Sequence, residues 1–227
     1  MSEFELEPTP RRGFLARLAA GSLALAASGF MTAKAESAPR SRANSPWDDS
    51  WMTRIKGKHR QIFDDMEVNS GFGPVMTRIW LMTNQQAYNI PETHLSAVLV
   101  LRHAAICIAM NDSIWAKYKL GEAFAVTDPV TSKPSERNIF AAAAGYPVPA
   151  FSAGAIDKLK ESGVIMCACN MALMHSATET GGKIGVAADA AIAEWKAGLL
   201  PGVTLVPSGV LAVNRAQEHG CTYCNVS

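Results

Sequence analysis

Two short apolar runs constrain the fold of this chain more than any other feature. Leu95–Leu101 reads LSAVLVL and Val164–Cys169 reads VIMCAC, and neither run alternates polar with apolar residues. A strand of this composition has to be covered on both faces, which is typical of the central strands of a parallel sheet. Parallel strands are joined by helical crossovers, so the two runs predict an α/β layer fold.

The rest of the chain alternates strands and helices. Weaker strands are expected at Arg60–Asp64, Val203–Val206 and Cys221–Val226. Helical spacing and turn residues predict helices at Pro74–Tyr88, Ile114–Tyr118, Ser152–Ser162 and Gly185–Ala197, and from the Pro207–Gly209 turn to His219. Strands separated by helices indicate a mainly parallel sheet.

The N-terminus has the features of a twin-arginine signal peptide. Thr9–Leu15 contains paired arginines, an apolar stretch follows from Leu18 to Phe30, and Ala33–Ala35 offers a small-x-small cleavage site. That stretch is shorter than the roughly 20 residues of a membrane span, although an uncleaved anchor helix is the alternative. We therefore expect residues 1–35 to be removed after export, leaving a periplasmic protein without a membrane segment.

The expected mature chain has two parts. Residues 36–50, rich in Ser, Pro, Arg and Asn, read as a flexible lead-in, and residues 51–227 form one α/β domain. Prolines interrupt the region 120–150, so we expect an insertion there that serves as a lid or an interface. Its apolar end, 138–151, needs cover from its own domain or from a neighbouring subunit.

Composition excludes several classes of ligand. The chain carries 21 Lys and Arg against 20 Asp and Glu, and without residues 1–35 the two signs balance. A neutral domain has no electrostatic reason to bind nucleic acid or an acidic membrane surface. The sequence also lacks a Gly-x-Gly-x-x-Gly, a phosphate loop, a His-Glu-x-x-His and a Gly-x-Ser-x-Gly motif, so we expect no cofactor.

Candidate functional residues lie where the expected strands end, because parallel sheets bind ligands beyond the carboxyl ends of their strands. These ends carry Asp64, Arg102–His103, Cys169–Asn170 and Ser208–Gly209. Cys169 is the best nucleophile candidate, since a helix starting after it would direct backbone N–H groups at the sulfur and favour the thiolate. A buried structural cysteine is the alternative.

Other side chains allow weaker hypotheses. Cys167 lies deeper in the same strand, and strand geometry points Cys221 and Cys224 to opposite faces, which argues against a redox pair. His103 could orient or deprotonate a substrate, or be structural. Zinc could bind the four cysteines Cys167, Cys169, Cys221 and Cys224, although two strands of a core sheet present them poorly for a tetrahedral site. Cu(I) could bind the sulfur-rich run of Met166, Cys167, Cys169, Met171, Met174 and His175, although core packing explains the same residues.

The segments 163–173 and 199–210, with the "PGV" and "VPSG" stretches in the second, resemble the DsrE/DsrF-like family. Arg60–Asp64 and Val98–His103 are similar to that family's first two strands, so the resemblance covers roughly 58–226. It implies a flavodoxin-like three-layer sandwich with a mainly parallel sheet of about five strands, assembled as a homotrimer or homohexamer.

The same resemblance implies sulfur handling, in which a cysteine after a central strand carries sulfur as a persulfide. Cys169 matches that position best and Cys167 is second, with Asn170 and the helix start stabilising the anion and His103 assisting. The expected function is a sulfur carrier, with or without sulfurtransferase activity, that exchanges sulfur with a donor or acceptor protein. The alternative is a non-catalytic binding module for a soft metal or a partner protein.

Overall fold

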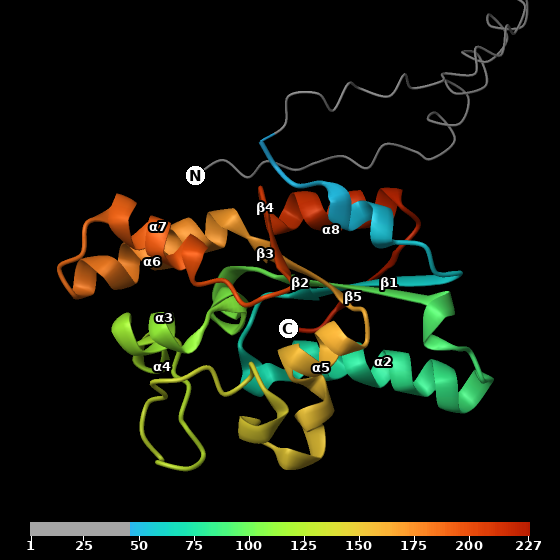
Figure 1. Cartoon of the computed structure of the whole chain (residues 1–227), viewed down its shortest axis with the longest axis horizontal. Coiled ribbons are helices and arrows are strands. Elements are labelled where there is room, and N and C mark those ends of the chain that lie inside the picture. The colour runs from blue at the N-terminus through green and yellow to red at the C-terminus, as the bar shows by residue number, and fades with distance from the viewer. Residues whose placement is uncertain (1–45) are drawn as a thin grey trace, which may run out of the picture. The chain divides into compact units, whose positions relative to one another are not determined.

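The computed structural model describes residues 46–227 (Figure 1). The expected signal peptide and most of the expected lead-in lie outside the described residues. Five parallel strands form one sheet in the order β4-β3-β2-β1-β5. Their bounds are His59–Asp65 (β1), Leu95–Leu101 (β2), Ile165–Cys169 (β3), Val203–Val206 (β4) and Thr222–Asn225 (β5). The predicted α/β fold with a parallel sheet of about five strands is confirmed.

Helices connect the strands. Their bounds are Phe72–Tyr88 (α2), Asp112–Lys117 (α3), Leu120–Ala123 (α4), Ile156–Glu161 (α5), Asn170–Lys183 (α6), Ala188–Ala197 (α7) and Gly209–Glu218 (α8). The prediction of a helix from Gly185 was wrong at its start: Gly185 has a φ of 74°, which a right-handed helix excludes. The helix predicted from Ser152 begins only at Ile156, because Pro149–Gly154 forms a tighter 3-10 turn.

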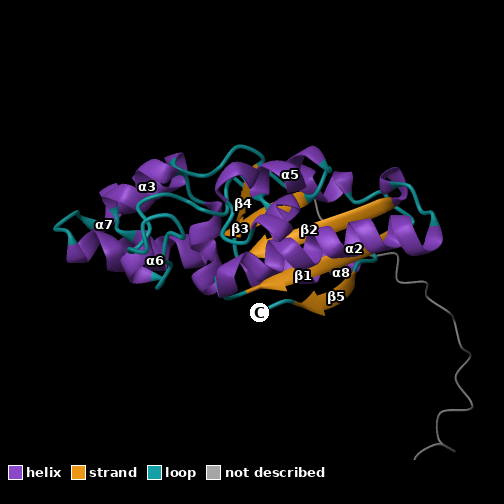
Figure 2. Ribbon diagram, turned by 90° about the horizontal axis from the view of Figure 1, so that it is seen from below, coloured by secondary structure: helices purple, strands orange, loops and turns teal. Residues whose placement is uncertain are grey.

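The helices cover the sheet from both sides, which makes three layers. Buried side chains of α2, α5, α6 and α7 join one core cluster, and those of α8 and the 3-10 turn Ser50–Arg54 (η1) join a second cluster on the opposite face. In Figure 1, α8 and η1 lie above the sheet, and α2 and α5 lie below it. Figure 2 shows α2 crossing β1 and β2 on the near face. This is the flavodoxin-like three-layer sandwich.

The register of the sheet aligns the carboxyl ends of its strands. Leu101 lies opposite Asp65 on one side and opposite Ala168 on the other, and Cys169 lies opposite Val206. Side chains alternate between the two faces of a strand. Ile62, Val98 and Cys167 pack in the cluster beneath α8. Side chains at every second position of a strand share a face, so the polar side chains in this register at the strand ends project from the face that α8 covers.

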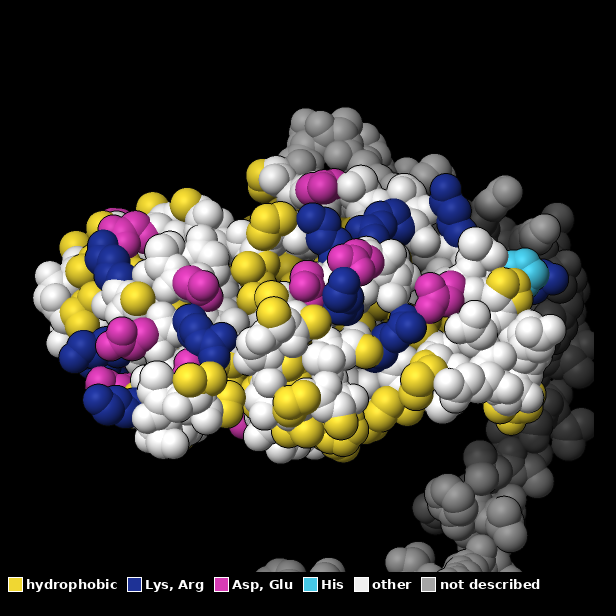
Figure 3. All heavy atoms as spheres, turned by 60° about the horizontal axis from the view of Figure 1, so that its bottom comes forward, with side chains coloured by type: hydrophobic (Ala, Val, Ile, Leu, Met, Phe, Trp, Pro, Cys, Tyr) yellow, Lys and Arg dark blue, Asp and Glu magenta, His cyan; other side chains and the backbone are white. Residues whose placement is uncertain are grey.

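The insertion at 120–150 is folded against its own domain. Asp128 and Arg137 form an ion pair at 2.7 Å that ties together the two arms of its exposed turn. Ile139, Phe140 and Tyr146 are buried in the core cluster that contains α2. The apolar end of the insertion is therefore covered mainly by its own domain. Figure 3 shows this side of the molecule, where apolar side chains reach the surface between side chains of both charge signs.

Within residues 46–227, no helix combines the length and the apolar content needed to cross a bilayer.

Candidate functional site

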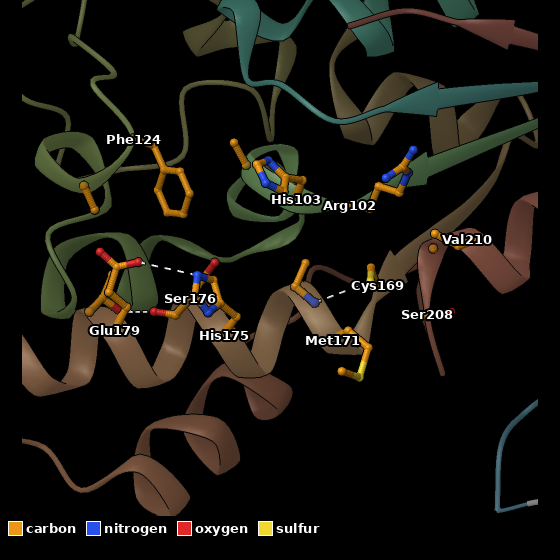
Figure 4. Close-up of a pocket in the computed structure, with 15 residues that line it drawn as sticks. Arg102, His103, Phe124, Cys169, Met171, His175, Ser176, Glu179, Ser208 and Val210 are labelled. Atoms are coloured by element: carbon orange, nitrogen blue, oxygen red, sulfur yellow. Dashed lines mark hydrogen bonds and ion pairs between the residues drawn. The ribbon is translucent and has the colours of Figure 1, made fainter. Parts of the chain in front are cut away.

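A cavity of about 480 Å³ lies at the carboxyl edge of the sheet, between the starts of α6 and α8 (Figure 4). The neighbouring strands β3 and β4 feed these two helices, which cover opposite faces of the sheet. Ligands bind at such a switch point in open α/β sheets, because the two connections diverge there and leave a crevice. The residues that line this cavity include Arg102, His103, Phe124, Cys169, His175, Ser208 and Gly209.

Cys169 is the thiol that faces this cavity. It is the last residue of β3 and the N-cap of α6, and its side chain is buried except for the part that lines the cavity. The backbone N–H of Ala172 donates a hydrogen bond to Cys169 Sγ at 3.4 Å (Figure 4). The sulfur therefore lies at the positive end of the 14-residue helix α6 and accepts one of its first backbone N–H groups.

The other four cysteines lie elsewhere in the fold. Cys107 and Cys167 are completely buried, and desolvation raises the pKa of both thiols far above the ordinary value. Burial also raises the pKa of Cys221, to about 11, although Arg60 partly opposes this shift. Cys221 and Cys224 pack on opposite faces of the sheet, as predicted, and no two of the five cysteines are joined by a disulfide.

Arg102, which lines the cavity, belongs to a cluster of three polar side chains with Asp64 and Tyr223. Arg102 Nε and Nη2 donate hydrogen bonds to the two carboxylate oxygens of Asp64, at 2.6 Å and 2.9 Å. The Tyr223 hydroxyl donates a third bond to Asp64 Oδ2 at 2.9 Å. The bonds to Asp64 raise the pKa of Arg102 above its ordinary value, and Tyr223 and Cys169 contribute smaller electrostatic effects of the same sign. A fixed positive charge therefore lies within electrostatic range of the Cys169 sulfur.

The turn into α8 fits closely against Arg102. A Cβ atom on Gly209 would lie 2.6 Å from Arg102 Cδ and 2.7 Å from Arg102 Cβ, so only glycine allows this approach. Ser208 caps the helix, because its hydroxyl accepts the N–H of Leu211 at 3.2 Å. The "PSG" segment thus holds the side chain of Arg102 in place and begins α8 beside the cavity.

His103 reaches the cavity through an unusual backbone conformation. Its φ is 52°, in the left-handed region that a residue other than glycine rarely occupies. This conformation turns the chain sharply at the end of β2 and leaves the imidazole exposed at the cavity wall. His175 lines the same cavity from α6, with its Nε2 3.8 Å from Glu179 Oε2. In Figure 4, His175 lies on α6, and His103 is drawn between Phe124 and Arg102.

Two of the four predicted site residues do not line the cavity. Asn170 is buried, and its side-chain amide donates to Met174 Sδ at 3.2 Å instead of reaching the Cys169 sulfur. Cys167 lies beneath α8. The structure therefore places Cys169 and His103 at the cavity, and the backbone of α6, rather than the Asn170 side chain, contacts the thiol.

Sequence reasoning missed Arg102 and Phe124 as site residues. Arg102 and Asp64 were recognised only as strand ends, although their alternation places both on the face from which Cys169 projects. Phe124 follows α4 in the insertion and gave no signal in the sequence. The cavity wall that it supplies depends on how the insertion packs.

The described residues offer no assembled set of ligands for the metal-binding alternative. In the part of the chain that the structure describes, no three His, Cys, Asp or Glu side chains are grouped so that they could hold an ion. Met171 and Met174 are both partly exposed on α6 instead of pointing together into the core.

Comparisons with known proteins leave the family open. No family model matches the chain, and no curated protein matches it. A solved structure described as a protein of unknown function, MTH1491 from Methanobacterium thermoautotrophicum, is 18% identical and covers 74% of this chain and 98% of its own. Its TM-score of 0.32 is too low to support an argument from that protein to this one.

Proposed function

We propose that this chain is an exported, DsrE-like sulfur carrier that holds sulfur as a persulfide on Cys169. The observation that carries the proposal is the placement of one sulfur: Cys169 Sγ accepts a helix N-terminal N–H and lines a cavity at the switch point of the sheet. Arg102 adds a positive charge nearby. The family resemblance supplies the class of chemistry, and the periplasm is proposed from the N-terminal sequence.

The transfer is nucleophilic at sulfur and involves no net oxidation or reduction. The Cys169 thiolate attacks the outer sulfur of a donor persulfide, R–S–SH. The donor's S–S bond breaks as the new S–S bond to Cys169 forms, and the donor leaves as the thiolate R–S⁻. An acceptor thiolate then attacks the outer sulfur of Cys169–S–SH, and Cys169 leaves as a thiolate. In this proposal His103, which lines the same cavity, exchanges the proton of the outer sulfur with solvent.

Mass spectrometry tests the carrier function. The mature protein is incubated with inorganic polysulfide, alkylated and digested, and the Cys169 peptide is weighed. We expect an increase by the mass of one sulfur atom, which dithiothreitol removes. Cys169→Ser should abolish the adduct. Cys224→Ser, which removes another incompletely buried thiol, should keep it. An unmodified Cys169, or equal modification of all five thiols, would contradict the proposal.

A partner-binding role is the second candidate, and one feature favours it. Four apolar side chains from the first turns of α6 and α8 are exposed beside the cavity: Met171, Met174, Val210 and Leu211. Such a cluster suits a protein partner, and methionines adapt well to varied surfaces. The partner could be a sulfur donor, a sulfur acceptor or another subunit of a homotrimer or homohexamer. Light scattering of the mature chain tests the oligomer, and a monomer mass at micromolar concentration would contradict it.

A further inference from the structure

The cavity beside Cys169 is far larger than the transfer of a single sulfur atom requires. Its volume of about 480 Å³ falls in the range of about 300 to 1,000 Å³ that is typical of sites for small organic ligands. We propose that the sulfur donor of Cys169 is a small organic persulfide with an apolar body, which binds in this cavity. The inference rests on the proposed carrier function and specifies its substrate class.

The lining of the cavity favours an apolar ligand. Its walls include Ala104, Ala123, Phe124, Ala172 and Val210. Such side chains offer contact area but no hydrogen bonds, so an apolar group gains from leaving water for this space.

Several polar groups of the lining already have partners within the protein, although the hydroxyl of the buried Ser176 has none among the described residues. Two nitrogens of the Arg102 guanidinium donate to Asp64. The Thr180 hydroxyl donates to the carbonyl of Ser176 at 2.7 Å, and the Ser208 hydroxyl accepts from Leu211. His103, His175 and Glu179 are exposed. A polar ligand body would find few free partners inside, whereas a polar group at its outer end could meet this exposed rim.

Phe124 makes the insertion part of the binding site. It follows α4 directly, and its partly buried ring packs against the core cluster that contains α2. The 120–150 region therefore supplies the wall of the cavity opposite α6 (Figure 4). We assign Phe124 as a specificity-determining residue that contacts the apolar body of the donor.

The burial of Cys169 argues for a small donor rather than a protein-borne one. Only 6% of the residue is exposed, and the residue lines the cavity. A persulfide on a partner protein would deliver one side chain and leave most of the cavity unfilled. A small donor R–S–SH fills the space with R, passes its outer sulfur to the Cys169 thiolate, and leaves as R–S⁻ when its own S–S bond breaks.

Two thiosulfonate probes test the substrate class. Methyl methanethiosulfonate and benzyl methanethiosulfonate share a reactive group: the thiolate takes the R–S group, and methanesulfinate leaves. We measure the rate at Cys169 for each probe and divide the benzyl-to-methyl ratio by the same ratio for free cysteine. We expect Cys169 to prefer the benzyl probe about tenfold or more over the preference of free cysteine, because the cavity buries one phenyl ring. The benzyl rate should also saturate with concentration.

Three variants test whether the benzyl preference arises in this cavity. Phe124→Ala should reduce the benzyl preference severalfold. Val130→Ala, which truncates a residue of the insertion that is 81% exposed and does not line the cavity, should leave the preference unchanged. Ala172→Leu should fill part of the cavity and slow the reaction of the benzyl probe more than that of the methyl probe. This variant provides an independent test if Phe124→Ala does not fold.

The outcomes separate this inference from the carrier function. If Cys169 takes sulfur from polysulfide but shows the benzyl-to-methyl rate ratio of free cysteine, the protein is a carrier and the proposal of an apolar small-molecule donor is wrong. If the benzyl preference is present but neither polysulfide nor benzyl persulfide adds sulfur to Cys169, the carrier function fails and the persulfide substrate fails with it. Benzyl preference together with sulfur transfer from benzyl persulfide supports both.

Discussion

Arg102 Nε lies 2.6 Å from Asp64 Oδ1, and Arg102 Nη2 lies 2.9 Å from Asp64 Oδ2, which makes a bidentate ion pair across the ends of β2 and β1. The Asp64 side chain is only 3% exposed. Tyr223 extends the cluster to β5, while Gly209 packs against the aliphatic part of Arg102. One ion pair thus connects the ends of several strands at the cavity.

Arg102→Met should lower both stability and thiol reactivity. Removal of the cation leaves a nearly buried carboxylate whose remaining partner is Tyr223, and loss of one partner of a buried pair costs about 3 kcal/mol of unfolding free energy. The thiolate of Cys169 also loses a nearby positive charge, so its alkylation at neutral pH should slow severalfold. Urea unfolding and timed iodoacetamide labelling measure the two effects.

Arg137→Met is the matched control for that experiment. It breaks the Arg137–Asp128 pair, whose shortest contact is also close, at 2.7 Å, but which lies in the insertion and is more exposed. We expect a smaller loss of stability than for Arg102→Met and an unchanged labelling rate at Cys169. Equal slowing in both variants would show that the effect is global and not electrostatic.

The five thiols should differ strongly in nucleophilicity. Cys169 should label fastest in the folded protein, by about tenfold or more over Cys107 and Cys167, because burial raises the pKa of those two. Competitive alkylation across a range of pH, followed by peptide mass spectrometry, ranks all five. If Cys169 reacts no faster than Cys107, or only after unfolding, the persulfide site is lost and the partner-binding role becomes the better account.

Asp65 should make the protein less stable as pH rises. Its carboxylate is fully buried and no oxygen accepts a hydrogen bond with ordinary geometry, so desolvation raises its pKa from 3.8 to about 8, while the N–H of Glu67 only partly opposes this. The negative charges of Asp64 and Glu67 add to the shift, and the neutral Cys107 and Tyr146 are also in electrostatic range.

The direction of this change in stability with pH follows from how many protons the folded and unfolded states bind. Between pH 3.8 and about pH 8 the folded state keeps a proton on Asp65 that the unfolded state has released, so unfolding free energy falls by up to about 1.4 kcal/mol per pH unit from this group. Asp65→Asn removes the contribution and should stabilise the protein at neutral pH by up to about 4 kcal/mol.

Urea unfolding at several pH values tests the Asp65 prediction. The exposed Asp189→Asn serves as the control, and its pH profile should match that of the unsubstituted protein. A profile for Asp65→Asn that keeps the original slope above about pH 5 would contradict the assignment of this slope to Asp65.

Export should depend on the paired arginines. We expect the double substitution Arg11→Lys and Arg12→Lys to leave the precursor uncleaved in the cytoplasm, because the twin-arginine pathway reads that pair. Cell fractionation with immunoblotting follows the precursor and the shorter mature form. Normal periplasmic processing of the double variant would show that a different route exports the chain.

The sequence alone was sufficient for the fold class and for two side chains of the candidate site, Cys169 and His103. Leu95–Leu101 and Val164–Cys169 were predicted to be central strands, because a continuous apolar run has to be buried on both faces. Cys169 followed from the end of one such run. The resemblance to the DsrE/DsrF-like family remains a prediction, as do export and oligomer formation.

Only the tertiary structure decided what surrounds the thiol. Asp64, Arg102 and Cys169 are far apart in the chain and meet because the sheet register aligns three strand ends and alternation puts their side chains on one face. Phe124 joins them through the packing of an insertion that has no periodic pattern. Asp65, one residue from Asp64, points to the opposite face and is buried with no carboxylate oxygen in a hydrogen bond of ordinary geometry. Local sequence patterns determine which segments become strands, but pairing, face and burial depend on contacts between residues distant in the sequence.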